Sequence, residues 1–430
     1  MLKLRWPRLS RAQLLRRAAL AYLIVWVLSP PLGYGAIWRV LAVLAMLLWL
    51  ALEALATRGV LLRPSWWVLG AVVFVLYTAF IEWLVPDSSA VNRQFSIWIM
   101  LFFLLVGESF RRGRDDDARF CFWLILLVLP IWMFTTLRGL ETIGADVSRA
   151  ISRTSDEAKQ LTEEGIGGFG FVYTVLLFVP FLAHLTLWAR GRLVGLTGKW
   201  QKRLGYGLIA ANCLLALALL LRAGYSIALL LTAFALAFVF LIRSRRLLPF
   251  AMSLCLSGLL VLVGGLALGP IFDILQGVAS GTEYSTKVRD VQASLEGGQS
   301  TGTLAMRVDR YQRSARLFME NPVLGTLTFN DVGKHSAILD RFAQYGFAFG
   351  LLFLLLITYI PLAMLRDRRV PIGLALAFLT IAITHPMTNN VFMSWGLVLY
   401  VFSYGTLAVM GIPLERRCRA RVDEGVIAHA

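Results

Sequence analysis

Long apolar runs recur along almost the whole chain, and they constrain its fold more strongly than any other feature. A helix needs about 20 mainly apolar residues to cross the hydrocarbon core of a bilayer. Twelve stretches of the 430-residue chain suit such a span, although the first and the eleventh are short. They cover residues 18–32, 37–56, 66–85, 95–110, 120–137, 169–189, 204–221, 225–242, 247–268, 342–365, 371–385 and 391–410. We therefore predict an all-α polytopic membrane protein with about twelve transmembrane helices.

The composition agrees with burial in a membrane. Only 16% of the residues are charged and 58% are hydrophobic, whereas an ordinary soluble domain carries about 25% charged residues. These proportions exclude a water-soluble globule and a disordered chain. The first apolar run follows a basic start and lacks a small-residue cleavage site, so we expect it to be a retained membrane helix.

The distribution of positive charge predicts the topology. A net charge of +17 would suggest a nucleic-acid partner in a soluble protein. In membrane proteins, however, Lys and Arg concentrate in the cytoplasmic loops. With a cytoplasmic N-terminus, 27 of the 42 Lys and Arg residues fall on that side, and every short loop there is basic. We therefore predict that both termini are cytoplasmic and that nucleic acid is not a partner.

The same topology divides the chain into four parts. Residues 1–269 would form transmembrane helices 1–9, and 337–411 helices 10–12. Between them, 270–336 would form a large outer loop with amphipathic helices near 283–295 and 304–320, and 412–430 a cytoplasmic tail. An acidic outer loop, 139–168, precedes the sixth helix.

Most ionisable residues of the apolar segments have an ordinary structural interpretation. The four cysteines and four histidines are too scattered for a disulfide framework or a metal-ligand pattern, so we expect no metal and no cofactor. Glu53 lies near a helix end and could snorkel toward water. Asp115–Asp117 stand beside arginines and indicate a solvated loop. His385 we interpret as a structural polar group at a helix end.

One stretch of the large loop carries a basic stripe. Arg307, Arg310, Arg313 and Arg316 repeat every three residues, which places them along one slanted line on a helix. Such a helix could anchor in lipid headgroups at the outer membrane surface. Alternatively, the stripe could bind an anionic substrate, because the guanidinium fork matches phosphate oxygens.

Two further residues lie at the same outer level. His335 stands directly before a membrane helix, where it could act as a general base near neutral pH. Arg222 lies between two apolar helices, and is either a snorkelling anchor or a ligand-binding group.

These elements together resemble the large periplasmic loop of bacterial O-antigen ligases and O-antigen polymerases. The resemblance rests on Arg307 with the aromatic Tyr311 four residues later, on the turn NPVLG at 321–325, and on His335 before a membrane helix. Arg222 matches the arginine at a helix start in that family. The motif region spans roughly residues 222–350.

The chain departs from the family pattern at three positions. Leu221 precedes Arg222 where the family has serine, and Ser336 follows the histidine where it has asparagine. Tyr311 stands where tryptophan is commoner. None of these departures removes a charged group.

The resemblance implies a GT-C-like, metal-independent membrane glycosyltransferase of the bacterial inner membrane. Its donor would be an undecaprenyl-diphosphate-linked glycan, its acceptor the lipid A core, and its active site periplasmic. Arg222 and Arg307 would hold the donor diphosphate, and His335 would be the general base. Secondary candidates for substrate binding are Arg310, Arg313, Lys334, Arg138 and Arg341.

Two alternatives stay open at this stage. An O-antigen polymerase uses the same donor but a glycan acceptor; we favour the ligase because a strongly basic loop helix suits the phosphorylated lipid A core. A twelve-helix secondary transporter would also fit the apolar bulk. Transporters usually contain related halves and helices broken at the midplane, and no internal repeat is evident here.

Overall fold

The computed structural model describes residues 10–33, 35–56, 59–85, 91–144, 156–189, 193–196, 198–243 and 303–412. Within those ranges every regular element is a helix. The predicted span 247–268, the predicted helix 283–295 and the tail 413–430 lie outside the described residues. Helical structure occurs at each of the other eleven predicted spans.

The helices agree closely with the apolar runs. The bounds are α1 Arg11–Leu28, the 3-10 turn η1 Pro30–Gly33, α2 Ala36–Ala54, α3 Trp66–Leu84, α4 Val91–Arg111, α5 Asp115–Thr142, α7 Asp156–Glu163, α8 Phe169–Trp188, α9 Lys199–Ala223, α10 Ser226–Leu241, α14 Thr303–Glu320, α15 Ala337–Arg366, α16 Ile372–Thr388, α17 Met393–Gly396, the π-helical turn η2 Leu397–Phe402 and α18 Ser403–Val409. Among them, α2, α3, α4, α5, α8, α9 and α15 are long and apolar enough to cross a membrane. The described chain therefore contains seven helices that could each span a membrane.

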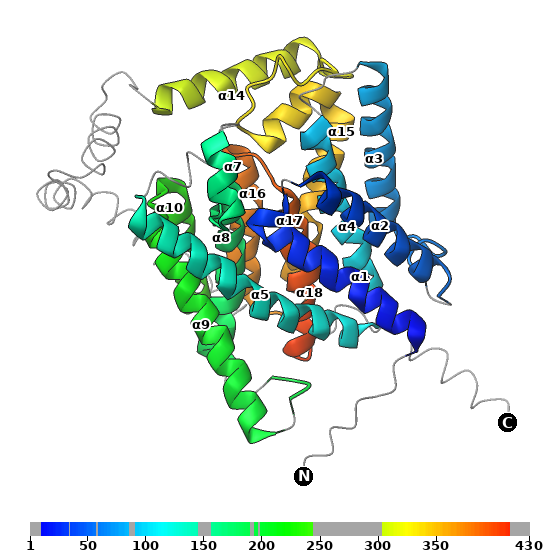
Figure 1. Cartoon of the computed structure of the whole chain (residues 1–430). Coiled ribbons are helices and arrows are strands. Elements are labelled where there is room, and N and C mark those ends of the chain that lie inside the picture. The colour runs from blue at the N-terminus through cyan, green and yellow to red at the C-terminus, as the bar shows by residue number, and fades with distance from the viewer. Residues whose placement is uncertain are drawn as a thin grey trace, which may run out of the picture.

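The bundle has central and peripheral helices (Figure 1). Helix α8 is buried along most of its length, whereas only about a quarter of the residues of α2 and α3 are buried. A peripheral helix that is apolar on its exposed side suits contact with lipid. Helix α14 differs from the others, because it lies across one end of the bundle above α15 (Figure 1).

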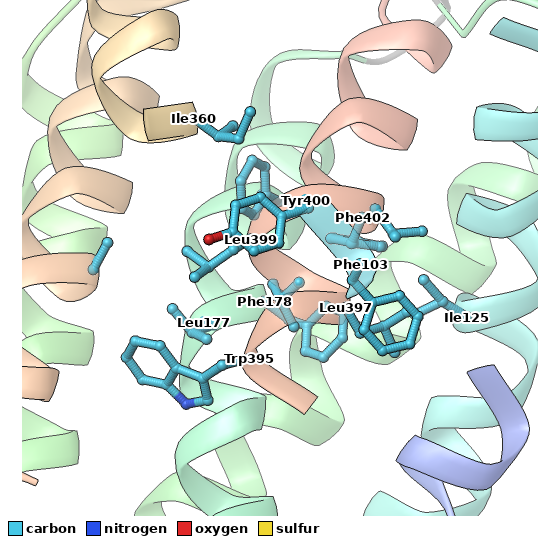
Figure 2. Close-up of a cluster of buried hydrophobic side chains, with 14 of the residues drawn as sticks. Phe103, Ile125, Leu177, Phe178, Ile360, Trp395, Leu397, Leu399, Tyr400 and Phe402 are labelled. Carbon is cyan, nitrogen blue, oxygen red and sulfur yellow. The ribbon is translucent and has the colours of Figure 1, made fainter. Parts of the chain in front are cut away.

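The centre of the bundle is built around α17, η2 and α18. Figure 2 shows Trp395, Tyr400 and Phe402 from this segment among side chains of neighbouring helices. Phe402 contacts Phe122 and Phe178, with ring centroids 5.1 and 4.7 Å apart. The buried Tyr400 hydroxyl donates to the Leu356 carbonyl at 2.9 Å, which satisfies a polar group that no water can reach.

Helix α15 bends sharply at Gly346, and the bend accommodates the NPVLG turn. Gly346 has φ +69°, and a Cβ there would lie 2.1 Å from the Val323 carbonyl oxygen. Only glycine tolerates both the left-handed backbone and this approach. The bend frees carbonyls at 343 and 344, which accept the amides of Thr326 and Leu327 at 2.9 Å each. The NPVLG turn packs at the bend, and the two residues after it tie the loop to the start of α15.

A buried ion-pair network joins α1, α2 and α5 at the end of the bundle opposite α14. Glu53 and Asp117 are almost fully buried, and Arg16 pairs with both. Arg17 also pairs with Asp117, and Arg114 with Glu53, at 2.7 and 3.1 Å. The interpretations of Glu53 as a snorkelling residue and of Asp117 as part of a solvated loop are therefore wrong. The sequence around Glu53 and around Asp117 does not indicate that arginines of α1 compensate these two carboxylates.

Candidate functional site

A cavity of about 720 Å³ opens at the α14 end of the bundle. Its walls come from the end of α1 with η1, from the starts of α2, α4, α8 and α17, from α7, and from the segments that precede α15 and α17. Besides three serines, the polar and charged groups on these walls are Arg39, Thr162, Lys334, His335, Asn389 and Asn390. The cavity therefore combines an apolar lining with a few convergent polar groups, the usual character of a small-molecule or cofactor site.

His335 lines this cavity, and the loop that carries it is firmly held. Lys334, with φ +63°, accepts a hydrogen bond at its carbonyl from the Asn390 side chain at 3.0 Å. The next residue, Ser336, caps α15 by accepting from the Leu339 amide at 3.1 Å. The amide of Ala337 donates to the Asn389 carbonyl at 3.0 Å. The imidazole is thus positioned by the helix cap on one side and the end of α16 on the other.

Arg310 is the residue of the basic stripe that reaches His335. Its guanidinium Nη1 lies within hydrogen-bonding distance of Nε2 of the imidazole. Because arginine has no acceptor, it must donate. Nε2 of His335 therefore carries the lone pair in this arrangement, and the ring proton is on Nδ1. The structure thus brings together Arg310 and His335, two of the residues predicted for the site.

Helix α14 is held over the cavity by its inward face. The Tyr311 hydroxyl donates to the Thr388 carbonyl at 2.8 Å. One turn later the buried Ser314 hydroxyl donates to Asp340 at 2.7 Å and accepts from the Gly333 amide at 2.8 Å.

The apolar side of α14 packs against protein. Leu317 and Phe318 contact a small cluster formed by Phe329, Val332 and Ala343. In the described part of α14 this side is therefore used within the molecule, as in an ordinary docked helix.

Arg222 does not line the cavity. It is exposed in the last turn of α9, which ends at Gly224 in the left-handed conformation. Tyr225 follows, and its ring stacks on Tyr173 at 5.5 Å and contacts Phe169 at 5.2 Å. Phe169 itself lines the cavity. Arg222 is thus not among the residues that line the cavity, although Tyr225, three residues later, contacts one that does.

The remaining predicted residues divide into three groups. Position 307 lies one turn before Arg310 on α14, and its side chain is outside the described set. Arg313 and Arg138 are exposed, on α14 and α5. Arg341 is buried against Phe329 and Tyr345 and donates to Gln344 at 2.6 Å. Of these, Arg341 is a packing residue in this structure.

Sequence reasoning missed several residues of the cavity. Arg39 lines it from the start of α2, and donates to the Gly33 carbonyl at 3.1 Å. Asn389 and Asn390 come from the end of α16. Arg39 is a basic residue on the predicted outer side, contrary to the positive-inside rule. This departure is the sequence signal that could have indicated a role in the site. The two asparagines follow His385 closely in the segment THPMTNN, and no motif distinguishes them.

His385 itself lies behind the cavity wall. Its ring is fully buried between Tyr173 and Trp395, with centroids 4.5 and 4.4 Å away. The prediction of a structural role agrees with this packing, although the residue is deeper than a helix cap. Among the described residues, no group of three or more His, Cys, Asp or Glu side chains is placed to hold a metal ion.

Comparison with known proteins adds no relative. No protein-family model matches the chain, and no curated protein matches it. Functional interpretation therefore depends on the geometry of the cavity and on the motif resemblance.

Proposed function

We propose that the protein is a membrane glycosyltransferase of the O-antigen ligase type. It would transfer a glycan from undecaprenyl diphosphate to the lipid A core at the periplasmic face of the inner membrane. The observation that carries the proposal is the contact of His335 with Arg310 beside the 720 Å³ cavity. A proton acceptor and a phosphate-binding group are then adjacent, as this reaction needs.

In the proposed reaction, the proton acceptor and the phosphate-binding groups each have one role. A hydroxyl oxygen of the acceptor attacks the anomeric carbon of the donor sugar and forms the new glycosidic bond. The bond from that carbon to the diphosphate oxygen breaks, and undecaprenyl diphosphate leaves with the electron pair. His335 takes the proton of the attacking hydroxyl. Cationic side chains stabilise the negative charge that develops on the leaving diphosphate.

Arg310 and Lys334 are the best placed of the described cations for the diphosphate. Lys334 lines the cavity, and Arg310 contacts the imidazole there. A diphosphate bound near Arg310 would compete with the imidazole for the guanidinium, because an anionic acceptor is stronger than a neutral ring nitrogen. Donor binding would thereby release Nε2 of His335 to accept the hydroxyl proton.

One departure from the family pattern has a simple physical basis. Ser336 acts as the N-cap of α15, and serine and asparagine are about equally good N-caps. A serine after the histidine can therefore cap the helix as well as the asparagine of the family pattern would.

The proposed orientation follows from charge. The α14 end, with the cavity, would face the periplasm, and both termini would be cytoplasmic. The described basic loops between α4 and α5 and after α15 lie at the opposite end, in agreement with the positive-inside rule.

A reconstituted transfer assay tests the proposal. Purified protein is mixed in detergent with undecaprenyl-diphosphate-linked glycan and lipid A core, and glycan-bearing core is measured by gel shift and mass spectrometry. We expect core modified with glycan. Extension of the donor glycan without modified core would identify a polymerase instead. No transfer, together with substrate flux in proteoliposomes, would identify a transporter.

The same assay tests the two residues first assigned to the diphosphate. Arg222→Ala and Arg307→Ala should weaken donor binding and turnover if their side chains reach the donor. Unchanged rates in both variants would place the diphosphate at Arg310, Lys334 and Arg39 alone.

A further inference from the structure

A second and larger cavity lies at the end of the bundle opposite α14. This groove, of about 1520 Å³, is lined by the start of α3, the last turn of α4, and the end of α15 with the residues that follow it. The part of α15 beyond Gly346 is a helix of 20 residues, which spans about 30 Å. The groove is therefore far from His335 and belongs to a separate site.

The inner wall of the groove holds one arginine in a fixed position. Glu108 is completely buried and accepts two guanidinium hydrogen bonds from Arg111, at 3.0 and 2.8 Å. Ser65 and Tyr359 also donate to this carboxylate, at 3.0 and 2.5 Å. Four donor groups on one carboxylate leave the Arg111 side chain little freedom, so a cationic group is preorganised at the groove wall.

Three further arginines stand at the rim, one at the last residue of α15 and two directly after the helix. Arg369 forms a two-point ion pair with Asp367, and this pair raises the pKa of Arg369 above its ordinary value. Arg366 and Arg368 are exposed in the groove, and neither pairs with a carboxylate within the described part of the chain. Counting Glu108 and Asp367 against the four arginines leaves an excess of two positive charges.

The other wall of the groove is apolar and aromatic. Trp67 stacks on Tyr359 with ring centroids 4.2 Å apart, and beside it Trp66 is 85% exposed. Leu69 and Leu355 line the groove further along α3 and α15, and both are exposed. Tryptophan is enriched at the level of lipid headgroups. An apolar wall that continues from the basic rim along two membrane-crossing helices suits an acyl chain attached to a charged headgroup.

We propose that this groove binds an anionic phospholipid, with the headgroup phosphate on Arg366, Arg368 and Arg111 and an acyl chain along Leu69 and Leu355. Basic pockets between transmembrane helices are suited to anionic headgroups. The occupant is a lipid and not a free phosphate, because a soluble anion would make no favourable contact with the apolar wall. The site is independent of the proposed glycosyl transfer.

Lipid binding to the full-length protein in detergent tests the proposal. Native mass spectrometry measures retention of phosphatidylglycerol and of phosphatidylcholine by the wild type and by the double variant Arg366→Gln, Arg368→Gln. We expect the wild type to prefer phosphatidylglycerol, and the double variant to lose about tenfold or more of that affinity, because each basic group near a lipid surface contributes about 1 kcal/mol. Phosphatidylcholine binding should change little.

A matched control separates the groove from general surface charge. Lys199→Gln with Arg203→Gln removes the same charge from exposed positions at the start of α9, outside the groove. Equal loss of phosphatidylglycerol in this control would overturn the proposal, as would unchanged binding in the groove variant. Displacement of the lipid by millimolar inorganic phosphate would also overturn it, because the groove would then take a soluble anion.

Discussion

Two sets of arginines, one in the buried network of α1, α2 and α5 and one on α14, have opposite environments. At the end away from α14, Arg16, Arg17 and Arg114 pair with the buried Glu53 and Asp117. At the α14 end, the exposed Arg310 contacts an imidazole beside a cavity. Buried carboxylates neutralise the first set, whereas no carboxylate of the described chain pairs with Arg310.

This difference separates structural charge from charge available for ligands. A buried pair costs desolvation that its attraction only offsets, so removal of one partner leaves an uncompensated charge and is strongly destabilising. Arg310 is exposed and contacts a residue of the cavity wall, so its removal should affect binding and rate instead. The variants below test this division, from the largest expected effect to the smallest.

His335→Ala should reduce glycan transfer by about 100-fold to 10,000-fold, the usual contribution of a positioned general base. Thermal stability in detergent should stay near that of the wild type, because His335 lies at the edge of a cavity. Donor binding should persist, since the proposed diphosphate ligands remain. Transfer within a few-fold of the wild type would remove His335 from the mechanism and leave the α14 end without a proton acceptor.

Arg16→Met should cost about 3–5 kcal/mol of stability, because Glu53 and Asp117 would remain buried with fewer cations. The measurement is the thermal unfolding midpoint in detergent, with Arg203→Met on exposed α9 as control, expected to change stability by less than about 0.5 kcal/mol. Transfer per folded molecule should be unchanged. A variant as stable as the wild type would show that Arg17 and Arg114 suffice for both carboxylates.

The sequence predicts the helices better than it predicts the partners of single charges. Helix α3 covers Trp66–Leu84 where the apolar run is 66–85, because the length and hydrophobicity of a span are local properties. The burial of Glu53 depends on Arg16, which is 37 residues away. A carboxylate near a helix end looks the same in sequence whether it snorkels or pairs, so that contact could not be inferred.

The candidate site was predictable to the same limited extent. The motif placed His335 and the basic stripe at one end, and the three-residue spacing placed Arg310 on the stripe. Which arginine reaches the imidazole depends on how far the loop after α14 folds back. That path is set by Thr326 and Leu327, directly after NPVLG, which donate to the carbonyls of Ala343 and Gln344. Arg39 and Asn389 join the cavity from helices distant in the chain. No spacing rule relates such positions.

Arg310→Ala should reduce transfer by about tenfold or more, because it removes a charge-assisted donor from the proposed diphosphate site. Arg310→Lys should restore only part of the rate, since the ammonium group lacks the two-point fork. Arg313→Ala is the matched control: it lies three residues further on the same helix and is exposed. Equal loss in both alanine variants would mean that α14 acts as a general basic surface and not through a specific contact with His335.

Ser336→Ala should have the smallest effect. It tests whether every polar group near the cavity takes part in the reaction. Ser336 caps α15 through the Leu339 amide, so its loss should cost about 1 kcal/mol of stability. Transfer should fall no more than a few-fold, through slight displacement of the adjacent His335. Ser336→Asn preserves a capping oxygen and should keep both stability and rate. If Ser336→Ala instead abolished transfer at unchanged stability, the hydroxyl would have a role in the reaction, and the α14 end would contain a second chemical group beside the imidazole.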